Sequence, residues 1–402
     1  MRKMTPAVRC MVFVALAVAC AAPVARAQDK ARTQVYGFVM TDAGYNTEAI
    51  DPSWFDVQRP TKLPAFNQQF GDDGSVFFSV RQTRFGVKSW IPTAMGELKT
   101  QFEWEMFGVG VDAGQTTIRL RHAYGELGKW GVGQYWSPFM DIDVFPNTVE
   151  YWGPNGMAFF RNVQFRYMPI QGETRMTLAL ERPGASADGG IHSDIITPDV
   201  HARFPVPDAS AEYRVGRAWG YVEVAGIIGR IEWQDLSGGA TDISGSAARW
   251  GINVSSNLKF RGGADVARLQ VVHGEGIENY MNDAPVDVAT EPNNSVVTPI
   301  KGVALPVTGY VAFLDHAWNE KVSSSIGYSR VDIRNSAGQA PDAFKAGQYA
   351  LANLMFTPVP NFMWAIEGGW IDRENNSDGF RINNTHVQVS AKYNFSFDIG
   401  GE

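Results

Sequence analysis

Segments in which apolar and polar side chains alternate recur along most of this chain, and they constrain its fold more than any other feature. Clear examples are Glu97–Met106, Gly251–Phe260 and Val387–Phe395. A period of two places one set of side chains on each face of an extended strand. Because a water-soluble β-sandwich has the same alternation, these segments predict strands without deciding how the strands are assembled.

The connections between the predicted strands are sorted by length. Short, turn-forming joints occur at Pro92–Gly96, Gly128–Gly131, Pro169–Gly172, Gly216–Gly220, Arg261–Gly263, Trp318–Glu320 and Pro358–Asn361. Longer polar connections alternate with them at about 46–74, 108–115, 139–158, 184–207, 235–246, 275–304, 332–343 and 374–381. A transmembrane up-and-down barrel has short turns at one end and long loops at the other. These connections predict an all-β fold, a transmembrane up-and-down antiparallel β-barrel of about sixteen strands, and a barrel of that size leaves an aqueous channel.

The first residues have the features of an export signal. A basic start precedes a short apolar run, Met11–Ala22, and Ala25–Ala27 matches the small-x-small pattern of a signal-peptidase site. We predict cleavage after Ala27, and cleavage before Cys20 as a lipoprotein is the alternative. No apolar stretch of about 20 residues follows, as a membrane-spanning helix would need. The combination predicts an exported barrel in the bacterial outer membrane.

The predicted organisation is a signal peptide at 1–27 and a single barrel domain at 28–402. The second part has 375 residues, of which 31 are basic and 42 acidic, so its net charge is −11. A protein this acidic is a poor nucleic-acid binder. Both cysteines, Cys10 and Cys20, precede the cleavage site, so the barrel has no disulfide. The six histidines lack metal-ligand spacing, and we expect no cofactor and no metal.

Basic side chains share the polar faces of several predicted strands. Facing lipid at mid-membrane would be costly for arginine, so these side chains should point into the lumen. The planar fork of arginine suits carboxylates, because it donates two parallel hydrogen bonds. The candidate pore residues on the wall are Arg84, Lys88, Arg119, Arg121, Arg161 and Arg166, and His122 is placed on the face opposite Arg121. The alternative for each arginine is a structural ion pair with Glu103, Glu105 or Glu181.

The connection 139–158 mixes acidic and apolar residues. Asp141, Asp143 and Glu150 lie among aromatic and aliphatic side chains. A loop this apolar should not extend into water, so we expect it to fold inward and constrict the channel. Its acids would then face the arginines across the gap, and charged rings of this kind set ion selectivity.

Several motifs resemble those of known porins. Arg84–Lys88 (RFGVK), Arg121–Leu127 (RHAYGEL) and Phe160–Asn162 (FRN) are similar to motifs of the enterobacterial general diffusion porins. The stretch Gly133–Gly156 resembles the signature of the DcaP-like porins. That resemblance is strong from about residue 75 to 183 and continues to Phe395. It implies a trimeric outer-membrane channel that favours carboxylates.

The leading hypothesis is therefore a passive channel for small anionic solutes, such as dicarboxylates or aromatic acids. As partners we expect two further copies of the chain in a homotrimer, outer-membrane lipid and lipopolysaccharide, and no nucleic acid. An unselective porin is the nearest alternative. A barrel enzyme or an adhesin would belong to another class, but no nucleophile–base pairing stands out and no residues remain for a passenger domain. We expect no enzymatic activity.

Overall fold

The computed structural model of the chain describes residues 30–196 and 199–400. The signal peptide predicted at 1–27, with its cleavage site after Ala27, lies outside the described residues. Within them, no helix has the length and apolar character needed to cross a bilayer.

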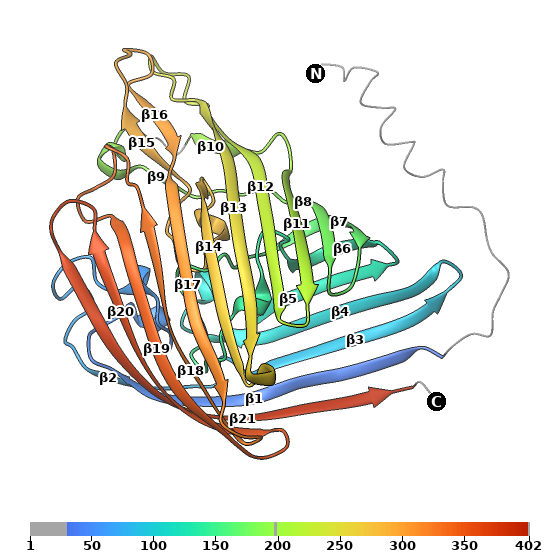
Figure 1. Ribbon diagram of the computed structural model, residues 1–402. Helices are drawn as coiled ribbons and strands as arrows, with labels where there is room; N and C mark the ends of the chain where they lie inside the picture. Colours follow the sequence, from blue (N-terminus) through green and yellow to red (C-terminus); the bar gives the residue numbers. More distant parts are fainter. Residues whose placement is uncertain (1–29, 197–198, 401–402) are drawn as a thin grey trace.

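Sixteen antiparallel strands of the described residues close into a barrel (Figure 1), as predicted. They are β1 (Arg32–Asn46), β3 (Arg84–Thr93), β4 (Gly96–Phe107), β5 (Thr116–Leu127), β6 (Trp130–Trp136), β7 (Arg161–Ile170), β8 (Arg175–Glu181), β11 (Asp208–Arg217), β12 (Gly220–Asp235), β13 (Gly245–Phe260), β14 (Asp265–Glu275), β17 (Pro306–Ala317), β18 (Val322–Ile333), β19 (Phe344–Val359), β20 (Phe362–Asn375) and β21 (Arg381–Ile399). Each pairs with its neighbour, and β1 closes the barrel on β21 from Thr33↔Ile399 to Asn46↔His386.

Two wall strands are interrupted and continue toward the long loops. β2 (Ser75–Ser79) extends β3 and pairs with β1, while β10 (Val200–Arg203) extends β11 and pairs with β12. The second break, at 204–207, contains two prolines, which cannot donate to the ladder. A small separate sheet joins the long loops through β9 (Ala187–Asp188), β15 (Val288–Pro292) and β16 (Ile300–Ala304). The 3-10 helices are η1 (Pro52–Trp54), η2 (Pro60–Lys62), η3 (Gly110–Asp112), η4 (Ile142–Val144), η5 (Gly190–His192), η6 (Arg261–Gly263) and η7 (Glu278–Tyr280).

The predicted sorting of connections by length is confirmed. Short turns join β3 to β4, β5 to β6, β7 to β8, β11 to β12, β13 to β14, β17 to β18 and β19 to β20. Several of them need a positive φ, which Gly96, Gly128 and Gly220 supply readily. The long connections lie at the opposite end, and three of them are named here: L1 (residues 47–74), L3 (residues 137–160) and L6 (residues 276–305).

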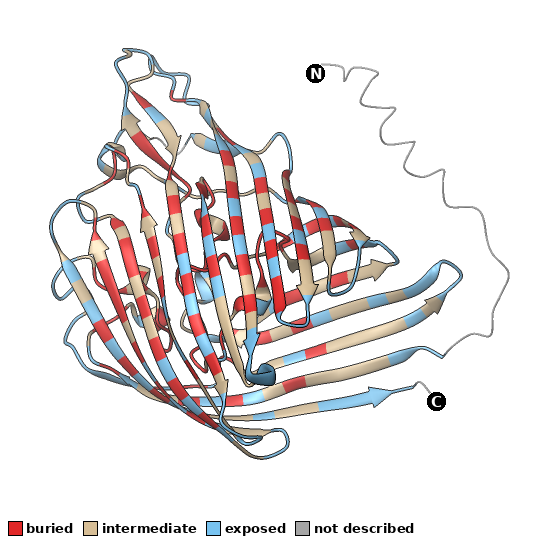
Figure 2. Ribbon diagram, in the orientation of Figure 1, coloured by how far each residue is buried: buried red, intermediate tan, exposed pale blue. Residues whose placement is uncertain are grey.

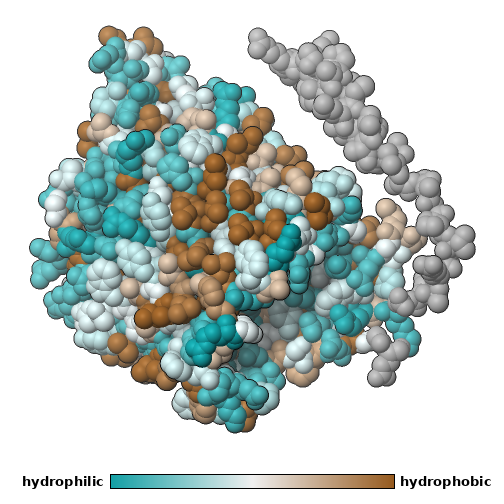
Figure 3. Space-filling view, viewed as in Figure 1, coloured by the Kyte–Doolittle hydropathy of each residue, from teal (hydrophilic) through white to brown (hydrophobic). Residues whose placement is uncertain are grey.

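Side chains alternate between the lumen and the outer surface along the strands (Figure 2). On β13, Asn253 and Ser255 are 1 % and 2 % exposed, whereas Ile252 and Val254 are 52 % and 44 % exposed. Figure 3 shows hydrophobic side chains gathered across the middle of the outer face. The outer surface therefore offers an apolar band to lipid, and the lumen is lined by polar groups.

The alternation fails where loops fold back onto the inner wall. On β12, Ala225 and Ile227 point inward and pack in one apolar cluster with Phe139 of L3. On β19, Tyr349 and Leu351 do the same against another part of L3. At these positions both faces of the strand are apolar, because the outward face meets lipid and the inward face meets a loop.

Candidate functional site

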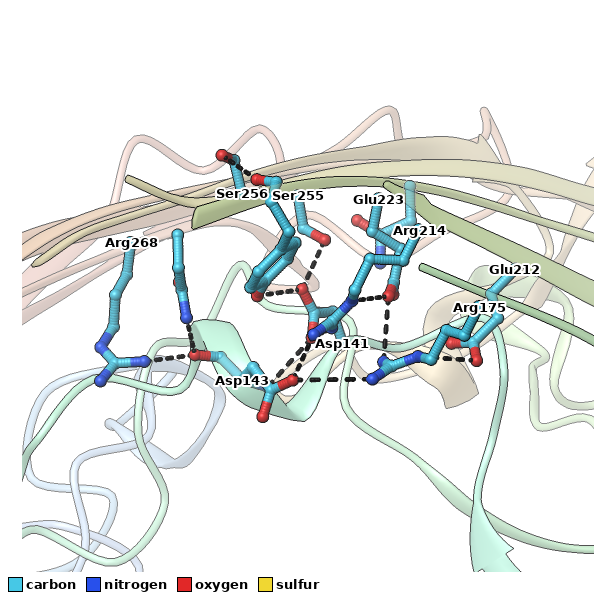
Figure 4. A network of polar contacts seen from close by, with 12 residues as sticks. Asp141, Asp143, Arg175, Glu212, Arg214, Glu223, Ser255, Ser256 and Arg268 are labelled. Atoms are coloured by element: carbon cyan, nitrogen blue, oxygen red, sulfur yellow. Dashed lines mark hydrogen bonds and ion pairs between the residues drawn. The ribbon is translucent and has the colours of Figure 1, made fainter. Parts of the chain in front are cut away.

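Loop L3 crosses the lumen, as predicted, and its root is tied to the inner wall by Asp141 (Figure 4). The Asp141 carboxylate accepts hydrogen bonds from Arg214 Nη2 at 2.6 Å, Tyr221 Oη at 2.6 Å and Ser255 Oγ at 2.7 Å. These partners come from β11, β12 and β13. The start of the loop is therefore anchored to three consecutive strands.

The neighbouring Asp143 belongs to the same network (Figure 4). Its carboxylate lies 2.5 Å from Arg214 Nη1 and 3.8 Å from Arg175 Nη1, and its backbone carbonyl accepts from Asn257 Nδ2 at 2.7 Å. The Asp143 side chain is 47 % exposed. It is thus a partly solvated acid that is already paired with arginines of β8 and β11.

The tip of L3 is held by two carboxylates that accept hydrogen bonds from backbone N–H groups of the loop. Glu367 on β20 accepts from Val149 N at 2.9 Å and Glu150 N at 2.7 Å. The Glu150 carboxylate accepts from three backbone N–H groups, the nearest being Gly153 N at 2.7 Å, and from Tyr349 Oη at 3.1 Å. Burial raises the pKa of Glu150 to about 8, although the backbone N–H donors lower it.

The expectation that the loop acids face the predicted pore arginines across the lumen is therefore wrong. Asp141 and Glu150 are 0 % and 2 % exposed, and their carboxylates bond to other groups. Asp143 bonds to Arg175 and Arg214, which were not among the predicted pore residues. The physical reason is that a carboxylate on an apolar loop is stabilised more by fixed donors on the wall it packs against than by solvated groups across water.

Arg84, Arg119 and Arg121 do gather on one side of the lumen, around two glutamates of β4. Arg121 donates to Glu103 at 2.6 Å and to Glu105 at 2.6 Å. Arg84 lies 3.3 Å from Glu105, and Arg119 Nε donates to Glu105 at 2.8 Å. The strand register explains this cluster, because Glu105 lies directly opposite both Arg84 and Arg119. The interstrand ion pairs considered as an alternative are present for these three arginines.

A β-bulge sets the direction of Arg121. The pairing of β4 with β5 passes from Glu103↔His122 to Trp104↔Leu120, which leaves Arg121 as the extra residue. Arg121 and His122 are consequently both turned inward, at 4 % and 2 % exposure. The placement of His122 on the opposite face is wrong for this reason, since alternation alone does not reveal a bulge.

Arg161 differs from the other three arginines. It stacks against Trp136, with Cζ 5.2 Å from the ring centre, and within the described residues it makes no hydrogen bond or ion pair. Its Nη1 is buried without a partner. Arg84, Arg119 and Arg121 share two glutamates and Arg161 has none, which leaves an excess of two positive charges at this point of the lumen.

Lys88 and Arg166 lie closer to the short turns. Lys88 is opposite Gln101, and its Nζ lies 4.9 Å from the ring centre of Tyr36. Arg166 donates to Gln164 Oε1 at 3.0 Å and stacks on Tyr124 and Tyr135. The structure does not bring these two residues into the cavity that the other four arginines line.

That cavity has a volume of about 690 Å³ and an uneven lining. Its basic side chains are Arg59, Arg84, Arg119, Arg121, Arg161 and Lys392, and its apolar side includes Phe38, Met40, Phe145, Val149, Met355 and Met363. Part of this apolar side forms one cluster, in which Met40, Val149, Met355 and Ala365 are buried. The arginines thus face a largely apolar side of the cavity, and the acids that also line it are Glu150 and Glu278.

Sequence reasoning missed Arg59 and Lys392. Lys392 follows the alternation of its strand, so its inward direction could have been found from the pattern. Arg59 lies in L1, where strand periodicity gives no guidance. The apolar content of L1, with Trp54, Val57 and Leu63 all buried, is the signal that this loop also folds inward.

The chain matches known proteins in sequence and in fold. A family model described as DcaP outer membrane protein matches residues 17–395. The outer membrane channel DcaP of Acinetobacter baumannii superimposes with a TM-score of 0.75 at 19% identity, over 94% of this chain and 100% of that chain. An anion-selective porin from Comamonas acidovorans gives a TM-score of 0.57 at 10% identity, over 91% and 100%. OmpT of Vibrio cholerae gives 0.56 at 11% identity, over 93% and 100%. A search of curated proteins finds no match.

Proposed function

The chain belongs to the DcaP family of outer membrane proteins, and on that premise we propose that its channel favours small organic anions over cations. Membership confirms the resemblance found in the sequence and makes the protein an outer-membrane porin, a non-enzymatic channel. The proposal concerns the solute. We assign to this channel the passive diffusion of dicarboxylates and aromatic acids.

The observation that carries the proposal is the charge balance at the constriction. Glu103 and Glu105 neutralise two of the four arginines, and Arg161 has no acidic partner among the described residues. The net charge of −11 on residues 28–402 would by itself repel anions. Charges outside the constriction are screened beyond about 8–10 Å in salt, whereas a solute in the cavity lies within a few ångströms of these arginines. The local excess of positive charge at the constriction should therefore decide which ions pass.

The apolar side of the cavity supports the assignment of aromatic acids. A flat ring with carboxylates at its edge can place its charge against Arg161 and its ring face against Phe145, Met355 or Met363. A compact dicarboxylate such as succinate gains the charge interaction alone. Binding has to stay weak, because a channel that retains its solute does not conduct it.

We also propose that the protein is a homotrimer and that its rim contacts lipopolysaccharide. Aromatic side chains cluster on the outer face of β3, β4 and β21, where Phe85 packs against Trp104 and Phe395. Such an apolar face suits a neighbouring copy as well as lipid. Cross-linking of intact cells followed by gel electrophoresis would test this, since a trimer band should appear and a monomer alone would contradict it.

The test of anion preference is a planar bilayer recording in a KCl gradient, repeated with phthalate, with succinate and with a diamine of similar size. The reversal potential should indicate chloride preference, and phthalate should block the current more than the diamine. Arg161→Gln should shift the reversal potential toward potassium and weaken the block. Arg217→Gln, an exposed residue at a short turn, is the matched control. If Arg161→Gln keeps the wild-type reversal potential and level of block, Arg161 does not set the selectivity; a wild-type reversal potential near zero would make the channel an unselective porin.

A further inference from the structure

Loop L1 enters the lumen and reaches the far wall. Gln58 packs against Gly369 of β20, and Pro60 packs against Gly347 of β19. Gln58 N also donates to Glu150 of L3 at 3.0 Å. The segment that carries Arg59 is thus fixed between the inner wall and L3.

Arg59 lies between two tryptophans. Its Cζ is 4.3 Å from the ring centre of Trp54 in L1 and 3.9 Å from that of Trp152 in L3. Arg59 Nε donates to Asp283 of L6 at 2.8 Å, and Asp283 also accepts from Thr61 N at 3.0 Å and Thr61 Oγ at 2.5 Å. Three loops therefore hold one guanidinium in a defined orientation.

The exposed part of this arrangement is the cation. The Arg59 side chain keeps 12 % of its exposure and lines the cavity, while the Asp283 side chain is 0 % exposed. Within residues 30–196 and 199–400, neither terminal nitrogen of Arg59 donates a hydrogen bond. The pair of terminal nitrogens is the edge of the guanidinium that can bind a carboxylate through two parallel bonds.

Arg59 is nearer to the outside than the arginine cluster. Trp54 and Trp152 both pack against Phe107, the last residue of β4 at the end where the long loops lie. Phe107 is two residues beyond Glu105 and four beyond Glu103, about 7 Å and 13 Å along the strand, and the ring centre of Phe107 is 5.7 Å from Arg119 Cζ. Tyr151 connects the two levels, because its ring stacks on Phe107 at 4.1 Å and its hydroxyl contacts Arg119 and Glu105.

We propose that Arg59, with Trp54 and Trp152, forms a docking site for carboxylates at the extracellular end of the cavity that the arginine cluster lines. The site takes aromatic carboxylates best, because the indole edges beside the guanidinium offer apolar contact to a ring. It lies ahead of Arg84, Arg119, Arg121 and Arg161 on the inward path, so it raises the rate at which anions arrive from outside. This inference rests on the proposed anion preference of the channel.

The test is phthalate block measured with phthalate in one chamber at a time. Orientation is established with Ser237→Cys in the loop between β12 and β13, labelled by an impermeant maleimide, since Cys10 and Cys20 are the chain's cysteines and both precede residue 28. Arg59→Gln should lower the rate of block from the extracellular side about tenfold, as expected for losing a charged hydrogen-bond donor. Block from the periplasmic side should stay unchanged.

The matched control is Lys62→Gln. Lys62 lies on the same loop, its Nζ is 5.4 Å from the ring centre of Trp54, and it pairs with Asp51 at 3.7 Å, but it does not line the cavity. An unchanged heat-modifiable gel shift would show that both variants are folded. Arg59→Lys, which keeps the charge but loses the planar fork, should recover part of the rate.

The outcomes separate this inference from the proposed function. If Arg161→Gln relieves block from both sides while Arg59→Gln behaves as Lys62→Gln does, the entrance site is refuted and the anion channel stands. An equal loss from both sides in Arg59→Gln also refutes it, because Arg59 would then act within the constriction. Absence of phthalate block in the wild type overturns both.

Discussion

Neutralising Glu105 should make the channel more anion-selective. Glu105 is 0 % exposed and pairs with Arg84, Arg119 and Arg121, so Glu105→Gln raises the excess of positive charge at the constriction from two to three. Glutamine has nearly the same shape and keeps one oxygen that can accept from the arginines. The substitution therefore tests charge with little change of volume.

The size of the effect follows from the dimensions of the cavity. A sphere of 690 Å³ has a radius of about 5.5 Å, and Glu105 lies about 3 Å behind the guanidinium groups, so an ion at the centre is about 8.5 Å from the lost charge. Coulomb's law gives about 0.5 kcal/mol at the dielectric constant of water and about 2 kcal/mol at an effective value of 20. Since about 1.4 kcal/mol is a factor of ten, the permeability should rise by about 2-fold to 30-fold for chloride and fall by the same factor for potassium.

The assay is the reversal potential in a tenfold KCl gradient, measured at two ionic strengths. The shift should shrink at the higher salt concentration, because screening shortens the range of the added field. A gel comparison of boiled and unboiled samples checks that the variant barrel is folded. The reasoning is refuted if the permeability ratio of Glu105→Gln stays at the wild-type value, or if it moves toward potassium.

Two further predictions concern the loops. Deleting Val144–Asn155 keeps Asp141 and Asp143 on their wall partners but removes the part of L3 that crosses the lumen, so single-channel conductance should rise; an unchanged conductance in a folded deletion would contradict the constricting role of L3. Burial, together with nearby Asp287, raises the pKa of Glu278 in L6 well above its ordinary value, and its two oxygens have no hydrogen-bond partner within the described residues. The neutral acid favours the folded state, so its stabilisation is complete at low pH and is lost as pH rises through the raised pKa. The unfolding temperature of the wild type should therefore fall more between about pH 5 and pH 9 than that of Glu278→Gln. Glu320→Gln, at an exposed residue, is the control and should behave as the wild type does. Equal falls in the wild type and Glu278→Gln would contradict the prediction.

The wall of the barrel could be predicted from the sequence because its rules are local. Alternation within ten residues and the order of short and long connections determine the number of strands, and the turns containing Gly96, Gly128 and Gly220 lie where they were expected. The breaks between β2 and β3 and between β10 and β11 were not predicted. The gap before β3 leaves the alternating pattern unchanged, whereas β10 lies inside the connection expected at 184–207 and was not predicted as a strand.

The site was predicted in part, because its geometry depends on non-local contacts. The wall arginines Arg84, Arg119, Arg121 and Arg161 line one cavity and Arg166 does not, and Arg121 owes its direction to a bulge. The partner of Asp141 is Arg214, 73 residues away in the chain, and pairing of this kind follows from how L3 lies against the wall. The alternation of polar and apolar residues fails on β12 and β19 for the same reason, since loops cover parts of their inward faces with apolar side chains.

The ties between L3 and β20 also order events in time. The N–H groups of Val149 and Glu150 are held by Glu367, more than 200 residues further along the chain. The loop can reach its final place only once β20 has joined the wall, whatever the sequence in which strands enter the membrane. Until then the tip of the loop lacks the acceptor that fixes it across the lumen, so the constriction is completed only late in the assembly of the barrel.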